Sequence, residues 1–338
     1  MRETNDVLVS VICTTYNQEK YIEKALNSIL NQKTSFKYEI IIHDDASTDN
    51  TEAIIKEYEK RYPDIIHAIY QKENQYSKGV LSDYKYIYPV AKGKYHAICE
   101  GDDYWTDDIK LEKQVQYMEL HPECMLTAHS GDYCYEDGVL TGNEFRPFFS
   151  DQIVSMEDIC SRWLFPTASI VYRATLRNNI IPFTKNAPCG DVPLVMYAAL
   201  HGTVYYMDAK MCVYRRGAKY SLTTQWKKNK QVLISVNLRF ISMLDQFDEY
   251  TNYQYSESID LFRKSKEYNN LILQNDIKTL QSSRYYEYYG ISIKRKLITC
   301  AKIYLPHLSN FIIAFIEMCK HYKCYIIHKA HNIKGDVK

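Results

Sequence analysis

The sequence predicts an α/β protein in which a mostly parallel β-sheet is flanked by helices and followed by a helical C-terminal extension. The first observation is that the N-terminal part alternates between short apolar runs and segments with helical periodicity. Such alternation with short connections is typical of a parallel sheet covered by helices. The second is that polar or acidic residues follow three of the first four expected strands. The third is that only Gly290, Pro306 and Gly335 interrupt the helix-compatible sequence after Tyr220.

Each element of this alternation has its own local signal. Residues 7–13 form an apolar run, as expected for a strand buried on both faces. The helix that follows carries an apolar stripe with i, i+3, i+4 spacing, made of Tyr21, Ile22, Ala25, Leu26, Ile29 and Leu30. Further strands are expected at 38–43, 65–70, 95–99, 125–129, 168–172 and 204–207. Further helices are expected near 54–62, 81–90, 110–120 and 192–201.

A change in sequence character near Thr224 predicts two regions, an α/β domain at 1–224 and a helical region at 225–338. The last part, 291–338, carries nine Lys or Arg against two acidic residues. Apolar residues recur there at helical spacing between the basic ones, which suits a helix lying on an anionic membrane surface. The alternative is a helix that packs against the α/β domain and leaves its lysines in solvent.

Bulk composition excludes several classes of protein. A formal net charge of +1 argues against a general nucleic-acid binder. The ten cysteines include no CxxC pair, and no apolar signal segment follows the first residues, so reduced thiols in a cytoplasm fit best. No run of 18 or more apolar residues predicts a spanning helix. We therefore expect a cytoplasmic protein, peripheral on the cytoplasmic face of the inner membrane if the basic tail binds lipid.

Polar side chains are expected to meet at one edge of the sheet. The segments 14–17, 44–45 and 100–103 each come directly after an expected strand. In open parallel sheets, ligands bind beyond the carboxyl ends of the strands. The convergence of these three segments therefore predicts a ligand site there.

The segment Glu100-Gly-Asp-Asp103 is the strongest candidate for chemistry. Clustered carboxylates repel one another unless cations or hydrogen bonds compensate them. Mg²⁺ and Mn²⁺ prefer oxygen ligands and often share them with substrate phosphates. A metal ion here would neutralise the charge of a departing diphosphate. The alternative is a solvated acidic loop in which Asp102 caps the next helix, but its place after a fourth strand favours the metal.

The two other segments suit recognition of a nucleoside. Asp44 and Asp45 end the second expected strand, where an acid typically accepts hydrogen bonds from a ribose or base. An Asx turn is the alternative. Thr14, Tyr16 and Asn17 follow the first strand with hydroxyls and an aromatic face suited to a nucleobase, although Asn17 equally suits the N-cap of the next helix.

These residues resemble family 2 glycosyltransferases, which have the GT-A fold. The resemblance rests on Val9–Asn17, Ser28–Gln32, Glu39–Thr51 and Glu100–Asp103, and extends over roughly 7–220. It is nearest to the bacterial branch that builds capsules, lipopolysaccharide and other surface glycans. It implies an inverting transferase that uses a nucleoside diphosphate sugar, a UDP-sugar first of all, with Mn²⁺ or Mg²⁺. The implied acceptor is a glycan or lipid-linked sugar.

The resemblance also implies roles for individual residues. The positions that match the family's nucleoside site or adjoin it are Thr14, Tyr16, Asn17 and Asp45. Asp102 matches the acid that faces the ribose and diphosphate, and Asp103 matches the metal ligand. Glu100 stands where the family's DXD signature has its first Asp, which leaves its role open.

The second half of the resemblance supplies a base. Cys189–Leu194 resembles the family segment whose acid opens a helix beneath the acceptor. Asp191 would then take the proton of the acceptor hydroxyl, a contribution typically worth about 100- to 10,000-fold in rate. The alternative is that Asp191 only caps the helix. Tyr214–Arg216 resembles a stretch that often reads Tyr-Arg-His, which implies a contact of Arg215 with the diphosphate, although Arg216 departs from the pattern.

Other classes fit the sequence less well. No GxGxxG follows the first strand, so a dehydrogenase is disfavoured. A nucleotidyltransferase would need a glycine-rich basic loop at 14–20. The remaining alternative is a non-catalytic sugar-nucleotide sensor or membrane-associated scaffold, and the presence of both Asp103 and Asp191 argues against it. The resemblance to family 2 glycosyltransferases thus implies transfer from an α-linked donor to form a β-type linkage.

Overall fold

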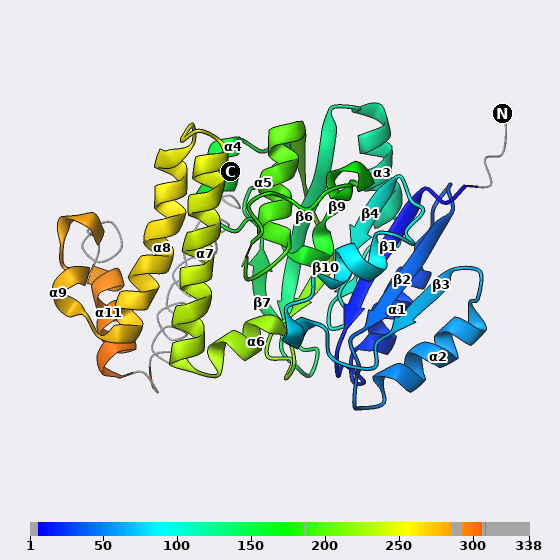
Figure 1. Cartoon of the computed structure of the whole chain (residues 1–338), viewed down its shortest axis with the longest axis horizontal. Helices are drawn as coiled ribbons and strands as arrows, with labels where there is room; N and C mark the ends of the chain where they lie inside the picture. The colour runs from blue at the N-terminus through cyan, green and yellow to red at the C-terminus, as the bar shows by residue number, and fades with distance from the viewer. Residues whose placement is uncertain (1–5, 186, 286–292, 306–307, 309–338) are drawn as a thin grey trace, which may run out of the picture. The chain divides into compact units, whose positions relative to one another are not determined.

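The computed structural model describes residues 6–185, 187–285, 293–305 and 308. The chain forms two compact units, Met1–Phe262 and Arg263–Lys338. The first unit contains a mixed β-sheet with flanking helices. All the regular elements described in the second unit are helices (Figure 1). The predicted α/β class and the helical C-terminal region are therefore both confirmed.

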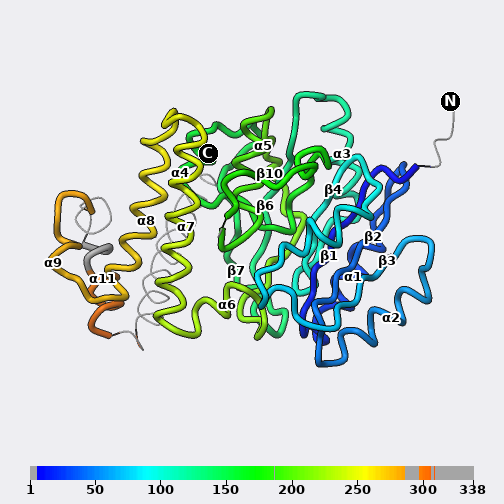
Figure 2. The backbone as a smooth tube through the Cα atoms, viewed as in Figure 1, coloured from blue at the N-terminus to red at the C-terminus, as the bar shows by residue number. Residues whose placement is uncertain are grey.

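The first unit contains a ten-stranded sheet with the order β3-β2-β1-β4-β9-β6-β10-β5, in which β7 pairs with β6 and β8 with β10. The strands are β1 Val9–Thr15, β2 Tyr38–Asp44, β3 Ile66–Tyr70, β4 Tyr95–Ile98, β5 Tyr104–Trp105, β6 Cys124–Cys134, β7 Leu140–Phe145, β8 Gln152–Ile153, β9 Val171–Arg173 and β10 Thr203–Arg215. β1 to β4 are parallel, and β9 runs against both β4 and β6. β6 and β10, far apart in the chain, run side by side and parallel (Figure 2).

Helices cover this sheet because its strands are apolar on both faces. The α-helices are α1 Ile22–Leu30, α2 Thr51–Arg61, α3 Lys110–Leu120, α4 Met156–Ser161, α5 Asp191–His201, α6 Leu222–Lys227, α7 Lys230–Tyr250, α8 Ser256–Gln274, α9 Ile277–Leu280 and α11 Ile293–Tyr304. Val11 of β1 is buried with α1 and α3, whereas its neighbour Ile12 belongs to a separate apolar cluster with Ile41 and Ile87. This alternation follows from the two-residue repeat of a strand. A larger core joins β6 and β10 to α5 and α7.

Two local expectations were wrong. Asn17 does not cap α1, because that helix begins at Ile22 after Tyr21, and Asn17 itself has a left-handed backbone with φ of 53°. The expected helix at 81–90 is only a short π-helical segment, η2, at Asp83–Ile87. Only Ile87 of this segment is buried, so an apolar face that would fix a regular α-helix is missing.

The predicted boundary between the two regions, at residues 224 and 225, stays a prediction. Helix α7 lies beyond residue 224, yet its Phe240 and Leu244 share the core of β6 and β10. The predicted amphipathic tail at 291–338 lies outside the described residues except for 293–305 and 308. Within the described part of the chain, every helix is too short or too polar to cross a bilayer.

Candidate active site

The end of β1 lies between the two acidic segments. The backbone N–H of Asp45, after β2, donates to the carbonyl oxygen of Thr15 at 3.0 Å. The N–H of Gly101, after β4, donates to the carbonyl oxygen of Thr14 at 3.1 Å. The structure thus brings the three polar segments to the same edge of the sheet, as parallel pairing of β2, β1 and β4 requires. Thr14 and Tyr16 are partly exposed at this edge.

The acidic turn packs tightly against the segment that follows β1. A Cβ atom at Gly101 would lie 2.3 Å from Oε1 of Gln18 and 3.0 Å from Oγ1 of Thr15, so only glycine fits there without displacement. The turn leads into β5, which pairs with β10. Because of this pairing, the acidic turn lies next to the end of β10.

Asp103 is held by one oxygen only. Its Oδ1 accepts the backbone N–H of Arg215 at 2.8 Å, whereas its buried Oδ2 has no hydrogen-bond partner. The side chain is 2% exposed. A buried carboxylate oxygen without a donor is costly unless a cation or a ligand compensates it. The residues present therefore fit a divalent cation, which commonly takes one or two carboxylates together with substrate phosphates.

Burial raises the pKa values of the three acids in the turn, Glu100, Asp102 and Asp103, and repulsion between neighbouring acids adds to the shift for Glu100 and Asp103. Burial, together with Asp102 and Asp191, raises the pKa of Glu100 to about 8. Burial raises the pKa of Asp102 to about 6, although Arg215 and a hydrogen bond from Gln18 oppose this. Burial and the charges of Asp102 and Glu100 raise the pKa of Asp103 well above its usual range. Each shift has the sign expected for buried carboxylates that repel one another, a cost that a bound cation would offset.

Without metal, the folded protein is expected to lose stability as the pH rises from near 4.5 to near 8. The folded state holds a proton on Glu100 that the unfolded chain releases near its ordinary pKa, so the free energy of unfolding falls across that window. The loss is on the order of a few kcal/mol. Urea unfolding in EDTA at several pH values measures it, and Glu100→Gln should flatten the slope. A slope of the opposite sign in wild type would contradict this account.

The second acidic segment is bonded to neighbouring loops. Asp44 accepts the N–H of Ser47 at 3.2 Å and its hydroxyl at 2.5 Å, so its side chain is bonded within the loop that follows β2. Asp45 accepts two backbone N–H groups, from Gln75 at 2.7 Å and from Tyr76 at 3.0 Å. Asn17 Oδ1 accepts the N–H of Thr48 at 2.7 Å. These side chains order the loops around the β1 end.

Asp191 is the first residue of α5, after Gly190 at the N-cap, so it does not act as the N-cap. Its Oδ1 accepts the N–H of Val192 at 2.9 Å, and its Oδ2 accepts the hydroxyl of Thr167 at 3.1 Å. The side chain is 6% exposed, and burial raises its pKa. The charge of Asp191 is one of the causes that raise the pKa of Glu100.

Arg215 holds the backbone around the acids. Its Nε–H donates to the carbonyl oxygen of Asp102 at 2.9 Å, and Nη1 donates to those of Tyr135 and Glu136 at 3.3 and 2.9 Å. The guanidinium also lies 4.6 Å from the centre of the Tyr21 ring. The buried side chain therefore has a clear structural role, and its contact with a diphosphate stays a prediction.

Three residues of the site carry no sequence signal that identified them. Gln18 bonds to Asp102, and Thr167 donates to Asp191. Asp83, on η2, raises the pKa of Glu100 from a segment more than ten residues earlier in the chain. In the sequence, these three residues look like ordinary polar loop residues. Their roles depend on contacts between distant segments, which the sequence does not show.

The fold is a mixed α/β domain with an acidic turn at the carboxyl edge of its sheet. Residues 10–172 match the family model described as Glycosyl transferase family 2. This segment is a glycosyltransferase family 2 domain, and the predicted family is confirmed.

Curated relatives support the same family. An uncharacterized protein of Mycobacterium bovis is 39% identical over 214 residues, which cover 62% of this chain and 59% of the relative. The Escherichia coli protein WfaP is 36% identical over 135 residues, covering 40% of this chain and 50% of its own length. Its name is UDP-Glc:alpha-D-GlcNAc-diphosphoundecaprenol beta-1,3-glucosyltransferase. The chain thus spans little more than half the length of these relatives.

Solved structures show the same fold. TarS of S. aureus (residues 1–349), in complex with UDP-GlcNAc, has a TM-score of 0.57 at 17% identity and covers 90% of this chain and 87% of its own. The mannosyltransferase PcManGT of Pyrobaculum calidifontis, in complex with GDP-Man and Mn²⁺, has a TM-score of 0.56 at 15% identity, covering 92% and 86%. At these identities the likeness concerns the fold alone.

Proposed function

We propose that the protein is an inverting glycosyltransferase that moves a sugar from a nucleoside diphosphate sugar to a glycan or lipid-linked acceptor in surface polysaccharide synthesis. The observation that carries this proposal is the unpartnered, buried Oδ2 of Asp103 in the acidic turn that follows β4 and is bonded to the end of β1. The charge of Asp191, the proposed base, is among the causes that raise the pKa of Glu100 in this turn. A family 2 domain with both a cation site and a base has the groups that sugar transfer needs.

In this proposal the edge of the sheet binds the donor. Asp103 would hold Mn²⁺ or Mg²⁺, which would supply positive charge to stabilise the departing diphosphate. Asp102 faces the ribose and diphosphate beside Glu100. The nucleoside contacts are assigned to Thr14, Tyr16, Asn17 and Asp45. Arg215 keeps the acidic turn in place through the Asp102 carbonyl and assists at the diphosphate.

Asp191 acts as the general base. Its carboxylate accepts the proton of the acceptor hydroxyl while that oxygen forms a bond to the anomeric carbon and the bond to the diphosphate oxygen breaks. Burial raises its pKa, which makes it a stronger base than an exposed aspartate. The Thr167 hydroxyl and the Val192 N–H fix its orientation. Attack opposite the leaving group converts an α-linked donor into a β-type linkage.

The names of similar proteins support the substrate class. WfaP is named for a UDP-sugar donor and a diphosphoundecaprenol-linked acceptor, and the TarS structure contains UDP-GlcNAc. A UDP-sugar is therefore the first donor to test, with a lipid-linked acceptor at the cytoplasmic face of the membrane. The alternative, a non-catalytic sensor or scaffold, would bind the donor and never turn it over.

Screening nucleotide sugars by thermal shift with Mn²⁺ tests donor binding. A donor present at a hundredfold excess over its Kd should stabilise the fold by about 2.7 kcal/mol. We expect one UDP-sugar to raise Tm in Mn²⁺ and much less in EDTA. If no UDP- or GDP-sugar raises Tm with either metal, the proposal fails. If the best donor is neither hydrolysed nor transferred to any acceptor, the sensor alternative is correct.

A further inference from the structure

A basic hollow adjoins the acidic site at the carboxyl edge of the sheet and shares Arg215 with it. Its volume is about 730 Å³, and the start of α1, the β6–β7 turn and the end of β10 surround it. Its charged lining consists of Lys20, Lys24, Arg215, Arg216, Glu136 and Asp137. Hollows of this size are in the range that binds small molecules or headgroups.

The two acids of the hollow already have partners. Glu136 accepts the Tyr21 hydroxyl at 3.0 Å and lies 3.5 Å from the Lys20 ammonium. Asp137 Oδ1 accepts the N–H of Val139 at 2.9 Å. The Lys24 ammonium lies 3.7 Å from the centre of the Tyr104 ring, and no acid in the described part of the chain forms an ion pair with it.

Arg216 adds a second cation held on an aromatic face. Its guanidinium lies 3.5 Å from the centre of the Tyr133 ring, and the residue is exposed. Lys24 is exposed as well. Cations placed on ring faces are oriented without being neutralised. The hollow therefore presents positive charge to an external anion.

An apolar tip stands beside these cations. The turn that joins β6 to β7 exposes Tyr135, Val139 and Leu140 at 56%, 59% and 54%. The turn is tight: the Tyr135 N–H donates to the Val139 carbonyl at 2.9 Å, and Gly138 has φ of 89°. Neighbouring exposed apolar side chains with adjacent cations suit the interface of an anionic bilayer.

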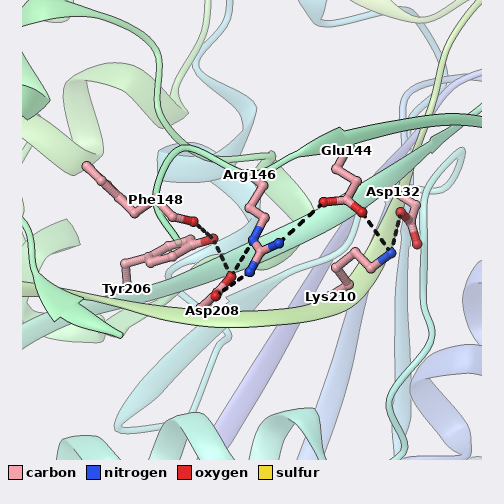
Figure 3. Close-up of polar contacts among 7 residues, drawn as sticks. All are labelled: Asp132, Glu144, Arg146, Phe148, Tyr206, Asp208 and Lys210. Carbon is pink, nitrogen blue, oxygen red and sulfur yellow. Dashed lines mark hydrogen bonds and ion pairs between the residues drawn. The ribbon is translucent and has the colours of Figure 1, made fainter. Parts of the chain in front are cut away.

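The hairpin behind the tip is braced. Figure 3 shows that Arg146 forms a fork with Asp208, and that Lys210 reaches both Asp132, at 3.1 Å, and Glu144, at 3.2 Å. These pairs join β7 to β6 and β10. Arg215 also holds the carbonyls at the start of the turn. A tip already fixed in place loses little conformational entropy when it inserts.

We propose that this surface docks the protein on an anionic phospholipid bilayer. Tyr135, Val139 and Leu140 enter the interface, while Lys20, Lys24 and Arg216 bind headgroup phosphates in the hollow. The acidic turn lies at the same edge of the sheet, so docking brings the site to the lipid surface. This inference does not depend on the proposed transfer reaction, because vesicle binding requires neither donor nor acceptor.

Flotation of the full chain with phosphatidylglycerol vesicles tests the cations. One lysine or arginine near an anionic surface contributes about fivefold in affinity, so Lys24→Gln with Arg216→Gln should weaken binding roughly 25-fold. The matched control is Lys60→Gln with Lys72→Gln, two exposed lysines away from the hollow. Raised salt should weaken wild-type binding. Unchanged binding of the hollow variant overturns the proposal.

The apolar tip needs its own variant. Val139→Ser with Leu140→Ser should weaken vesicle binding about tenfold or more by removing buried apolar area. Leu120→Ser is the control, because Leu120 is 71% exposed just before β6 begins, whereas the tip follows the end of β6. Circular dichroism checks that all variants fold. Equal binding of wild type to phosphatidylcholine alone, or complete release by millimolar inorganic phosphate, would overturn the proposal.

Discussion

Asp191→Asn is expected to lower the transfer rate about 100- to 10,000-fold while leaving donor affinity nearly unchanged. The asparagine amide keeps the shape of the side chain and an oxygen that can accept the Thr167 hydroxyl or the Val192 N–H. It cannot take a proton from the acceptor. The loss should therefore appear in kcat, measured by release of the nucleoside diphosphate in the presence of acceptor.

A control variant at a second aspartate near a helix start tests whether the rate loss of Asp191→Asn comes from a change at the helix N-terminus. Asp158 lies in the first turn of α4 and its side chain is 44% exposed, so Asp158→Asn should leave the rate within about twofold. Donor binding to Asp191→Asn, followed by thermal shift, should match wild type. Full activity of Asp191→Asn with normal pH dependence would exclude Asp191 as the base.

Asp103→Asn is expected to abolish the metal dependence of donor binding and to reduce turnover by about a thousandfold or more, since a lost metal contact removes several kcal/mol of charge stabilisation. The metal-free variant should nevertheless be more stable than wild type at pH 8. The asparagine oxygen still accepts the Arg215 N–H, while one charge leaves a cluster whose members raise each other's pKa.

The sign of this change is set by the loss of a charge that raises the pKa of its acidic neighbours. Urea unfolding in EDTA measures it, and Mn²⁺ titration followed by thermal shift measures the lost metal response. Asp108→Asn, a nearby acid that is exposed, serves as the control. A variant that keeps wild-type turnover with an unchanged Mn²⁺ requirement would contradict the assignment of Asp103.

Much of the fold was predictable because it depends on local periodicity. The apolar runs of β1, β2 and β4 and the stripe of α1 identify themselves within a few residues, and parallel pairing then sets their shared carboxyl edge. The helix expected at 110–120 coincides with α3. The acids at 100–103 were identified by the same logic, since they come after a buried strand.

The tertiary structure alone decided how those acids are held. The Arg215 N–H reaches Asp103 only because β10 pairs with β5, which joins segments more than a hundred residues apart. The Thr167 contact with Asp191, the role of Asn17 as an acceptor for Thr48 and the braced hairpin beside the basic hollow arise in the same way. Sequence by itself determined the strands, the helices and the residues at the strand ends, because backbone preference and apolar repeat are local. The partners of each polar side chain needed the structure, because they are set by which distant segments pack together.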